Sequence, residues 1–227
     1  MSDSHTLRVI ARIHSDFQEK FGIPRQSGLV EELQARVVFE PPYRNPDALR
    51  GLEEFSHIWL IWQFSRAVRE GFSPTVRPPR LGGNQRLGVF ATRSPFRPNP
   101  IGLSLVRLVE IGPDREAGPV LLVAGADLLD GTPIYDIKPY LPYVDCRPEA
   151  AGGFTDRTPR QVLEVVCPPE LLERVPPEKR RALLGVLAQD PRPSYQEDPE
   201  RVYGMAFAGL NVKFTVSGRR LTVLEIL

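Results

Sequence analysis

The chain has 227 residues, of which 41% are hydrophobic and 25% charged, and its formal net charge is +1. This composition is that of a globular protein with a full hydrophobic core, and it excludes a low-complexity chain. No apolar run approaches about twenty residues, which argues against a membrane span. The only cysteines are Cys146 and Cys167, and no secretory segment follows Met1. We therefore expect a cytoplasmic protein without a disulfide scaffold.

The first two thirds of the chain predict short β-strands. Apolar and polar residues alternate over residues 7–13, which is the period of a half-buried strand. Turn residues such as Asp130-Gly131 separate the β-rich runs that follow. These runs span residues 37–39, 58–64, 87–91, 103–109, 120–124 and 134–137. Many short strands at irregular spacing predict a mainly-β fold with a closed or nearly closed barrel.

The last third of the chain has a different character. Paired prolines open a short helical pattern over residues 170–174 and a longer one over residues 178–188. A hairpin pattern about a Ser-Gly turn follows at residues 215–224. Residues 147–159 are rich in Gly, Pro, Ala and Thr and are predicted to be a linker. We therefore expect a β-barrel domain over residues 1–146 and a small α+β domain over residues 160–227.

A strongly basic segment lies between Glu70 and Glu110. It contains no Asp, Glu or Lys but six arginines, namely Arg77, Arg80, Arg86, Arg93, Arg97 and Arg107. Planar guanidinium groups suit bidentate contacts to phosphate or carboxylate. We predict that Arg77, Arg80 and Arg97 bind nucleic-acid phosphate. The alternative is a solvated face whose arginines pair with acids elsewhere in the fold.

Two loops rich in glycine and proline lie in this basic segment, at residues 77–84 and 93–102. Prolines beside the arginines reduce the entropy that each loop loses on folding, so the guanidinium groups are held ready for a ligand. Loops of this length tend to be functional. The alternative is a proline-stiffened connection of the barrel without a function.

A third segment, residues 127–140, combines a tight turn with acidic side chains. Asp127 and Asp130 bracket the turn, and Asp136 and Lys138 share one face if their strand is regular. The alternatives to a functional role are that Asp130 stabilises its own Asp-Gly turn and that Asp136 forms a surface ion pair with Lys138.

Several chemistries have no motif in this sequence. It contains no Gly-X-Gly-X-X-Gly after a strand, no Walker loop and no Gly-X-Ser-X-Gly elbow. His5, His14 and His57 do not have the spacing of metal ligands, and the two cysteines are isolated. We therefore predict no metal site.

Five ordered motifs resemble those of the TsaA-like family of bacterial tRNA methyltransferases. They lie at residues 24–28, 51–59, 77–104, 127–142 and 188–193. The resemblance implies a non-Rossmann antiparallel barrel of seven or a similar number of strands, a small C-terminal domain, and a homodimer that binds S-adenosylmethionine near its interface. It also implies methylation of the exocyclic amine of threonylcarbamoyl-adenosine, next to the anticodon of threonine tRNA.

The resemblance further implies which residues form the cofactor site. They are Gln26, Ser27, Gly28, Ser65, Arg66, Arg93, Leu103, Gly131, Thr132, Pro133 and Ile134. Many bacterial members have His-Gln where this chain has Ser65-Arg66, so the contacts expected from this corner are those of its backbone.

Methyl transfer from a sulfonium needs alignment of the two reactants in a dry pocket rather than a strong nucleophile. We predict that Asp136 accepts the proton of the amine and that Lys138 and Tyr140 orient the substrate. The predicted phosphate contacts would then be to tRNA. Two other functions stay open, a non-catalytic RNA-binding barrel and an S-adenosylmethionine-dependent enzyme with a small-molecule substrate.

Overall fold

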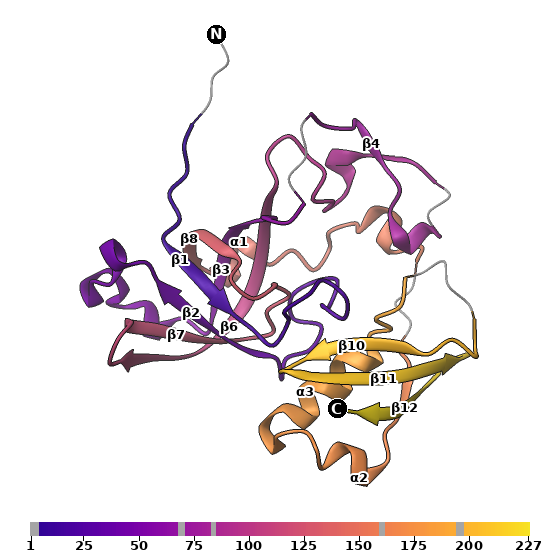
Figure 1. The fold of residues 1–227 in the computed structure, drawn as a ribbon. Coiled ribbons are helices and arrows are strands. Elements are labelled where there is room, and N and C mark those ends of the chain that lie inside the picture. Colours follow the sequence, from indigo (N-terminus) through magenta and orange to yellow (C-terminus); the bar gives the residue numbers. More distant parts are fainter. Residues whose placement is uncertain (1–4, 68–70, 83–84, 159–161, 194–197) are drawn as a thin grey trace.

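The computed structural model describes residues 5–67, 71–82, 85–158, 162–193 and 198–227. In this part of the chain one group of strands forms a barrel and a second group forms a smaller sheet flanked by helices (Figure 1). No helix among the described residues is long and apolar enough to cross a membrane. Both cysteines are free.

Six of the described strands close into a barrel in the order β1-β2-β7-β6-β3-β8. All neighbouring pairs in this ring are antiparallel. The mainly-β prediction is therefore confirmed. The strands are β1 (Ala11–His14), β2 (Gln34–Phe39), β3 (His57–Gln63), β6 (Ile101–Asp114), β7 (Gly118–Ala124) and β8 (Pro133–Pro139).

The barrel core follows from the two-residue period of its strands. In β3, Ile58, Leu60 and Trp62 are buried inside the barrel, and the residues between them are only half-buried. Burying each such side chain contributes about 1.5–3 kcal/mol. A side chain at Gly102 of β6 would collide with the Trp62 indole, so glycine is needed opposite this tryptophan.

Two predicted strands differ from the structure. β1 begins only at Ala11, although the apolar alternation starts at Leu7. Of residues 87–91, only β5 (Leu87–Gly88) is a strand, paired with β4 (Thr75–Val76), and a 3₁₀ helix follows. Pro74 and Pro78 lie beside β4, and a proline cannot donate the hydrogen bond that a longer ladder would need.

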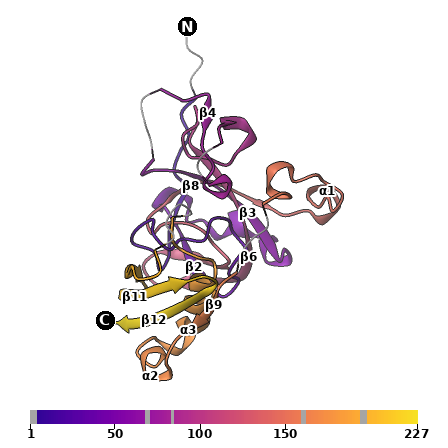
Figure 2. The ribbon, with the colours of Figure 1, turned by 90° about the vertical axis from the view of Figure 1, so that its right-hand side faces the viewer.

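Short helical turns fill the connections of the barrel. They are η1 (Pro41–Tyr43), η2 (Pro46–Leu49), η3 (Leu52–Glu54), η4 (Pro79–Leu81), η5 (Val89–Ala91), α1 (Pro142–Asp145) and η6 (Gly153–Thr155). Most begin at or beside a proline, whose fixed φ suits the first turn of a helix. In Figure 2, α1 projects to one side of the barrel.

The C-terminal unit is a four-stranded sheet in the order β10-β11-β12-β9, with α3 packed on one face (Figure 1). Leu183 and Leu187 of α3 are fully buried against it. The predicted long helix and the terminal hairpin are both present. The elements are β9 (Glu164–Val166), α2 (Pro169–Leu172), α3 (Pro177–Ala188), β10 (Tyr203–Phe207), β11 (Leu210–Ser217) and β12 (Arg220–Ile226).

The core of the C-terminal unit also contains residues from the first connection of the barrel. Phe17, Val30 and Leu33, all from the segment between β1 and β2, belong to this cluster. The Phe17 ring meets Phe207 edge-on at 5.7 Å between centroids, and Asp16 pairs with Lys179 at 2.6 Å. The β1–β2 connection is therefore held between the barrel and the C-terminal unit.

Candidate active site

Three connections of the barrel meet at one of its ends. β-Sheet register places Trp62, near the end of β3, opposite Gly102 of β6 and Ile134 of β8, which both lie at the start of their strands. The connections at this end span residues 15–33, 64–100 and 125–132. Every predicted cofactor residue lies in one of them or at the first residues of β6 or β8, so the topology brings these separate segments together.

The loop Gln26–Gly28 is fastened to both of the other connections. Arg93 Nη1 donates to Gln26 Oε1, and the Gly28 amide donates to the Gly125 carbonyl at 2.8 Å. The Leu105 amide of β6 donates to Ser27 Oγ at 3.1 Å. These bonds hold the Arg93 guanidinium beside the loop, where it is exposed and able to bind a carboxylate.

A half-buried carboxyl group, Asp127, lies behind this loop. Trp62 Nε1 donates to Ser104 Oγ at 2.9 Å, and Ser104 Oγ donates to Asp127 Oδ1 at 2.6 Å. Burial raises the pKa of Asp127, although the Ser104 hydrogen bond, two backbone amides and the Arg93 charge act against it. Sequence reasoning placed Asp127 only at the edge of a turn, because nothing in the local pattern indicates that its side chain is half-buried.

The raised pKa of Asp127 makes a stability prediction. A carboxyl whose pKa is higher in the folded than in the unfolded protein stabilises the fold below its unfolded value of 3.8, and this contribution is lost as pH rises through the folded pKa. The free energy of unfolding of the parent, relative to Asp127→Asn, should therefore fall between about pH 4 and neutrality. Urea denaturation across this range measures it. A difference that stays constant or rises with pH would contradict the prediction.

The turn before β8 offers its backbone rather than its side chains. Gly131 has a φ of 72°, and its carbonyl accepts from Arg12 Nη1 at 3.2 Å. Thr132 is buried and its hydroxyl donates to the Leu129 carbonyl at 2.7 Å. Pro133 and Ile134 are buried as well. Any ligand contact from this turn is therefore made by main-chain atoms.

The remaining predicted cofactor residues lie on exposed positions. Ser65 and Arg66 follow β3, and the Arg66 carbonyl accepts from Lys20 Nζ at 2.8 Å. Leu103 is 50% exposed on the outer face of β6. Its side chain thus points away from the barrel core, whereas that of Ile134 points into the core.

The donors and acceptors at this end of the barrel fit S-adenosylmethionine. The Arg93 guanidinium suits a carboxylate, and the Gln26 amide and nearby backbone groups suit ribose and adenine. Space is open beside Gly28 and Gly131, where an added Cβ would meet no atom within 4 Å. Among the described residues, no group of three or more His, Cys, Asp or Glu is placed to hold a metal ion.

The predicted catalytic residues lie along the outer face of β8. Asp136 stands opposite Ile61, which stands opposite Leu103, so Asp136 is two strands from a predicted cofactor residue. A β-bulge between Ile61 and Trp62 shifts the register of β3 against the start of β8. Lys138 Nζ lies 3.0 Å from Asp136 Oδ2 with both side chains about half exposed. Tyr140 lies further toward the other end of the barrel.

The predicted phosphate-binding arginines differ in their surroundings. Arg77 is exposed and forms no ion pair with the described residues. Arg97 is half-buried and donates to the Thr92 carbonyl at 3.1 Å, so it also holds its own loop. The side chain of Arg80, Gly83 and Asn84 of the same loop, and Pro159 of the predicted linker lie outside the described residues.

Family models match both parts of the chain. The model described as the tRNA-methyltransferase O N-terminal domain matches residues 12–146, and the TrmO C-terminal domain model matches residues 163–227. The chain belongs to the tRNA-methyltransferase O family. The family resemblance of its sequence motifs is thereby confirmed, and the TrmO match extends to the C-terminal unit.

Relatives and solved structures agree with the TrmO assignment. The chain is 43% identical over 225 residues to the tRNA (adenine(37)-N6)-methyltransferase of Escherichia coli K12, covering 96% of this chain and 95% of that protein. It is 52% identical over 163 residues to the Eikenella corrodens protein of the same name, covering 71% and 91% respectively. A crystal structure of TrmO from Pseudomonas aeruginosa matches with a TM-score of 0.79 at 35% identity, covering 99% of this chain and all of that chain.

Proposed function

We propose that this chain is an S-adenosylmethionine-dependent methyltransferase. Its substrate is the exocyclic amine of threonylcarbamoyl-adenosine, next to the anticodon of threonine tRNA, in the cytoplasm. The observation that carries the proposal is the meeting of Arg93, the Gln26–Gly28 loop and the Gly131 turn at one end of the barrel, in a chain of the TrmO family. Free cysteines suit the reducing cytoplasm.

Different residues at this end of the barrel bind different parts of S-adenosylmethionine. Arg93 binds the carboxylate of S-adenosylmethionine, and Gln26, Ser27, Gly28 and the main chain of the Gly131 turn hold its ribose and adenine. The bound cofactor supplies an electrophilic methyl group. Ser65, Arg66 and Leu103 contribute to the edge of the site, in large part through backbone groups.

The chain's own residues orient the acceptor and remove its proton. Asp136 accepts a proton of the amine, and its ion pair with Lys138 at 3.0 Å orients the carboxylate. Lys138 and Tyr140 orient the tRNA nucleotide. Holding the two reactants in one geometry accounts for much of the rate enhancement, because no strong nucleophile is required.

The proposal includes a homodimer of two-domain subunits. The barrel domain spans residues 1–146, the linker residues 147–159 and the C-terminal domain residues 160–227. Two hydrophobic clusters support this division, and Phe17, Val30 and Leu33 of the barrel domain pack into the C-terminal cluster. An apolar outer face of β3 and β6, with Ile101 37% and Leu103 50% exposed, supports a subunit interface beside the cofactor residues.

Incubation of the purified protein with labelled S-adenosylmethionine and total tRNA tests the function. We expect label in methylated threonylcarbamoyl-adenosine after nucleoside analysis, at the same rate with and without EDTA, since Arg93 and backbone groups suffice to hold the cofactor. Transcribed tRNA without the threonylcarbamoyl group serves as the control substrate. Binding of tRNA without any methylation would favour a non-catalytic RNA-binding barrel instead. Label found only in small molecules would favour an S-adenosylmethionine-dependent enzyme with a small-molecule substrate.

A further inference from the structure

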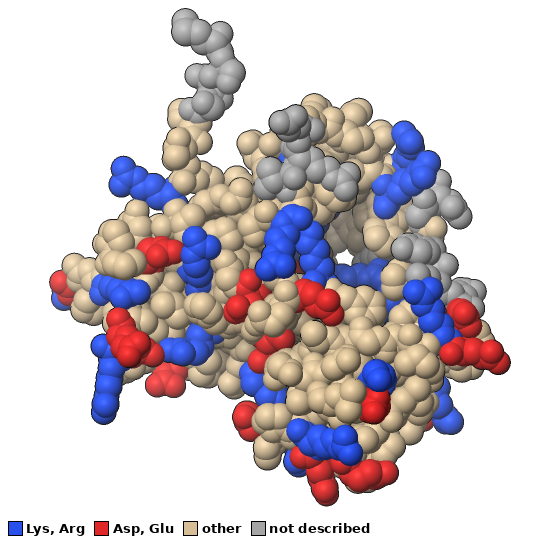
Figure 3. Space-filling model, viewed as in Figure 1, with Lys and Arg blue, Asp and Glu red and all other residues tan. Residues whose placement is uncertain are grey.

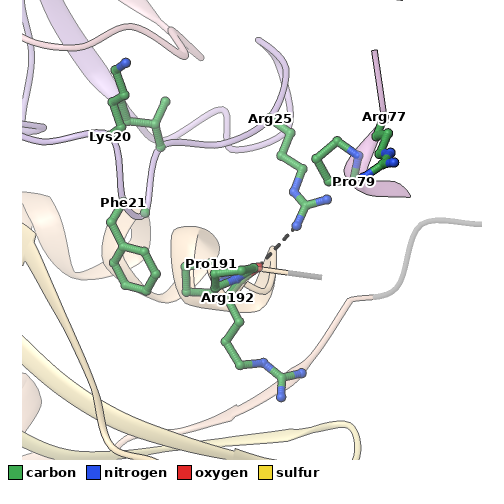
Figure 4. A pocket seen from close by; sticks show the side chains of 10 residues that line it. Lys20, Phe21, Arg25, Arg77, Pro79, Pro191 and Arg192 are labelled. Carbon is green, nitrogen blue, oxygen red and sulfur yellow. Dashed lines mark hydrogen bonds between the residues drawn. The ribbon is translucent and has the colours of Figure 1, made fainter. Parts of the chain in front are cut away.

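A cavity of about 410 Å³ lies where the barrel connections meet the C-terminal unit. Its walls come from three segments, the β1–β2 connection, the β3–β6 connection and the chain after α3 (Figure 4). We call it the junction cavity. Its charged lining residues are Lys20, Arg25, Arg77 and Arg192. No predicted cofactor residue lines it, so it is distinct from the site described above.

Three of the four cations that line the junction cavity, Lys20, Arg25 and Arg77, lack a paired acid among the described residues. The lining of the cavity contains no Asp or Glu. Lys20 and Arg25 donate to main-chain carbonyl oxygens, of Arg66 at 2.8 Å and Arg192 at 3.3 Å, which leaves their charges unbalanced. Three exposed cations around one cavity favour an anionic ligand.

Neighbouring acids do not neutralise these cations. Asp190 forms a two-bond pair with Arg192, at 2.8 and 2.9 Å. Glu19, next to Lys20 in the chain, accepts from the Ala206 amide at 3.3 Å and forms no ion pair with the described residues. Figure 3 shows lysine and arginine side chains, with acidic side chains next to some of them, around the hollow between the barrel and the C-terminal unit.

The uncharged walls of the junction cavity suit a flat ring. Phe21 and Ile23 lie on one side and prolines from the other two segments lie on the others. Rigid apolar walls with exposed cations at their edges combine base stacking with phosphate contact, which is how proteins hold single-stranded nucleic acid. The volume lies within the range of about 300–1,000 Å³ that is typical of small-ligand sites.

The position of the cavity indicates which nucleic acid it binds. Arg25 directly precedes Gln26 of the cofactor loop, and Lys20 is bonded to Arg66 at the corner after β3. A ligand in this cavity would therefore lie next to the two segments that are proposed to hold the methyl donor. A tRNA whose adenosine reaches the methyl donor would extend past Lys20 and Arg25, which favours a tRNA nucleotide as the anionic ligand.

We propose that the junction cavity binds a nucleotide of the tRNA substrate other than the reacting adenosine, with Lys20, Arg25 and Arg77 contacting its phosphate. This inference rests on the proposed function. It also assigns a role to the C-terminal unit, which supplies Pro191, Arg192 and Pro193 as one wall of the RNA site.

Salt-dependent tRNA binding by Arg25→Ala and Arg77→Ala tests the proposal. Each variant should lower the slope of log Kd against log salt by about 0.7 to 0.9, because one phosphate contact is lost. Affinity for S-adenosylmethionine and the melting temperature should stay near the parental values. Arg25→Lys should restore most of the slope, and Arg86→Ala, in the same basic segment but outside the cavity, should keep it.

Two outcomes would overturn the proposal. Folded variants with the parental salt slope would show that these cations do not contact RNA. A loss of S-adenosylmethionine affinity with unchanged tRNA binding would show instead that the cavity takes the cofactor carboxylate. Failure of the proposed function is distinguishable, because the parental protein would then transfer no methyl group to tRNA, whatever the salt slopes of the variants.

Discussion

Replacing Arg93 by alanine is expected to weaken S-adenosylmethionine binding about ten- to a hundredfold. A hydrogen bond to a charged group contributes about 1.5–3 kcal/mol, and each 1.4 kcal/mol is a factor of ten in affinity. Arg93 also bonds to Gln26, so its loss releases the cofactor loop from the β3–β6 connection. Among the predicted cofactor residues it is the one whose side chain carries a suitable charge next to that loop.

Titration calorimetry of parent and variant measures this effect. Arg86→Ala is the matched control, because Arg86 is an exposed arginine of the same basic segment without a predicted cofactor contact. The Arg93→Ala protein should melt near the parental temperature, since Arg93 is exposed. An unchanged dissociation constant would remove Arg93 from the cofactor site.

Replacing Ile61 by glutamate is expected to separate the proposed dimer and to lower methylation by more than about a hundredfold. Ile61 lies on the central strand of the outer face, between Leu103 and Asp136. A carboxylate placed there would be buried without a partner in the dimer, which costs several kcal/mol. Because predicted cofactor and catalytic residues share this face, loss of the dimer would also disrupt the site.

Sedimentation and kinetics at the same protein concentration test the dimer prediction. Leu224→Glu is the control, since Leu224 is 47% exposed on β12 of the other sheet and should tolerate the charge. The Ile61→Glu protein should sediment as a folded monomer. A monomer with full activity, or an active dimer that retains glutamate at this position, would contradict the prediction.

Local patterns predicted the elements whose character depends on their own residues. The alternation of Ile58, Leu60 and Trp62 identified β3, and the spacing of Leu183 and Leu187 identified α3. β9 was missed because its three residues are too few to show a period, and β10 was missed although Tyr203, Met205 and Phe207 alternate with smaller residues. Residues 87–91 were overpredicted, because apolar residues in a proline-rich loop imitate a strand.

The sequence by itself determined a mainly-β chain with a late helix, a basic segment and the motifs of one family, since each of these properties depends on residues close together in the chain. The tertiary structure brought three connections to one end of the barrel, placed the half-buried Asp127 behind the Gln26–Gly28 loop and placed Arg25 near Arg192. Burial, pKa and cavities depend on which distant segments meet. These contacts between distant segments depend on closure of the barrel and on the packing of Phe17 into the C-terminal core. Neither property produces a local pattern in the sequence.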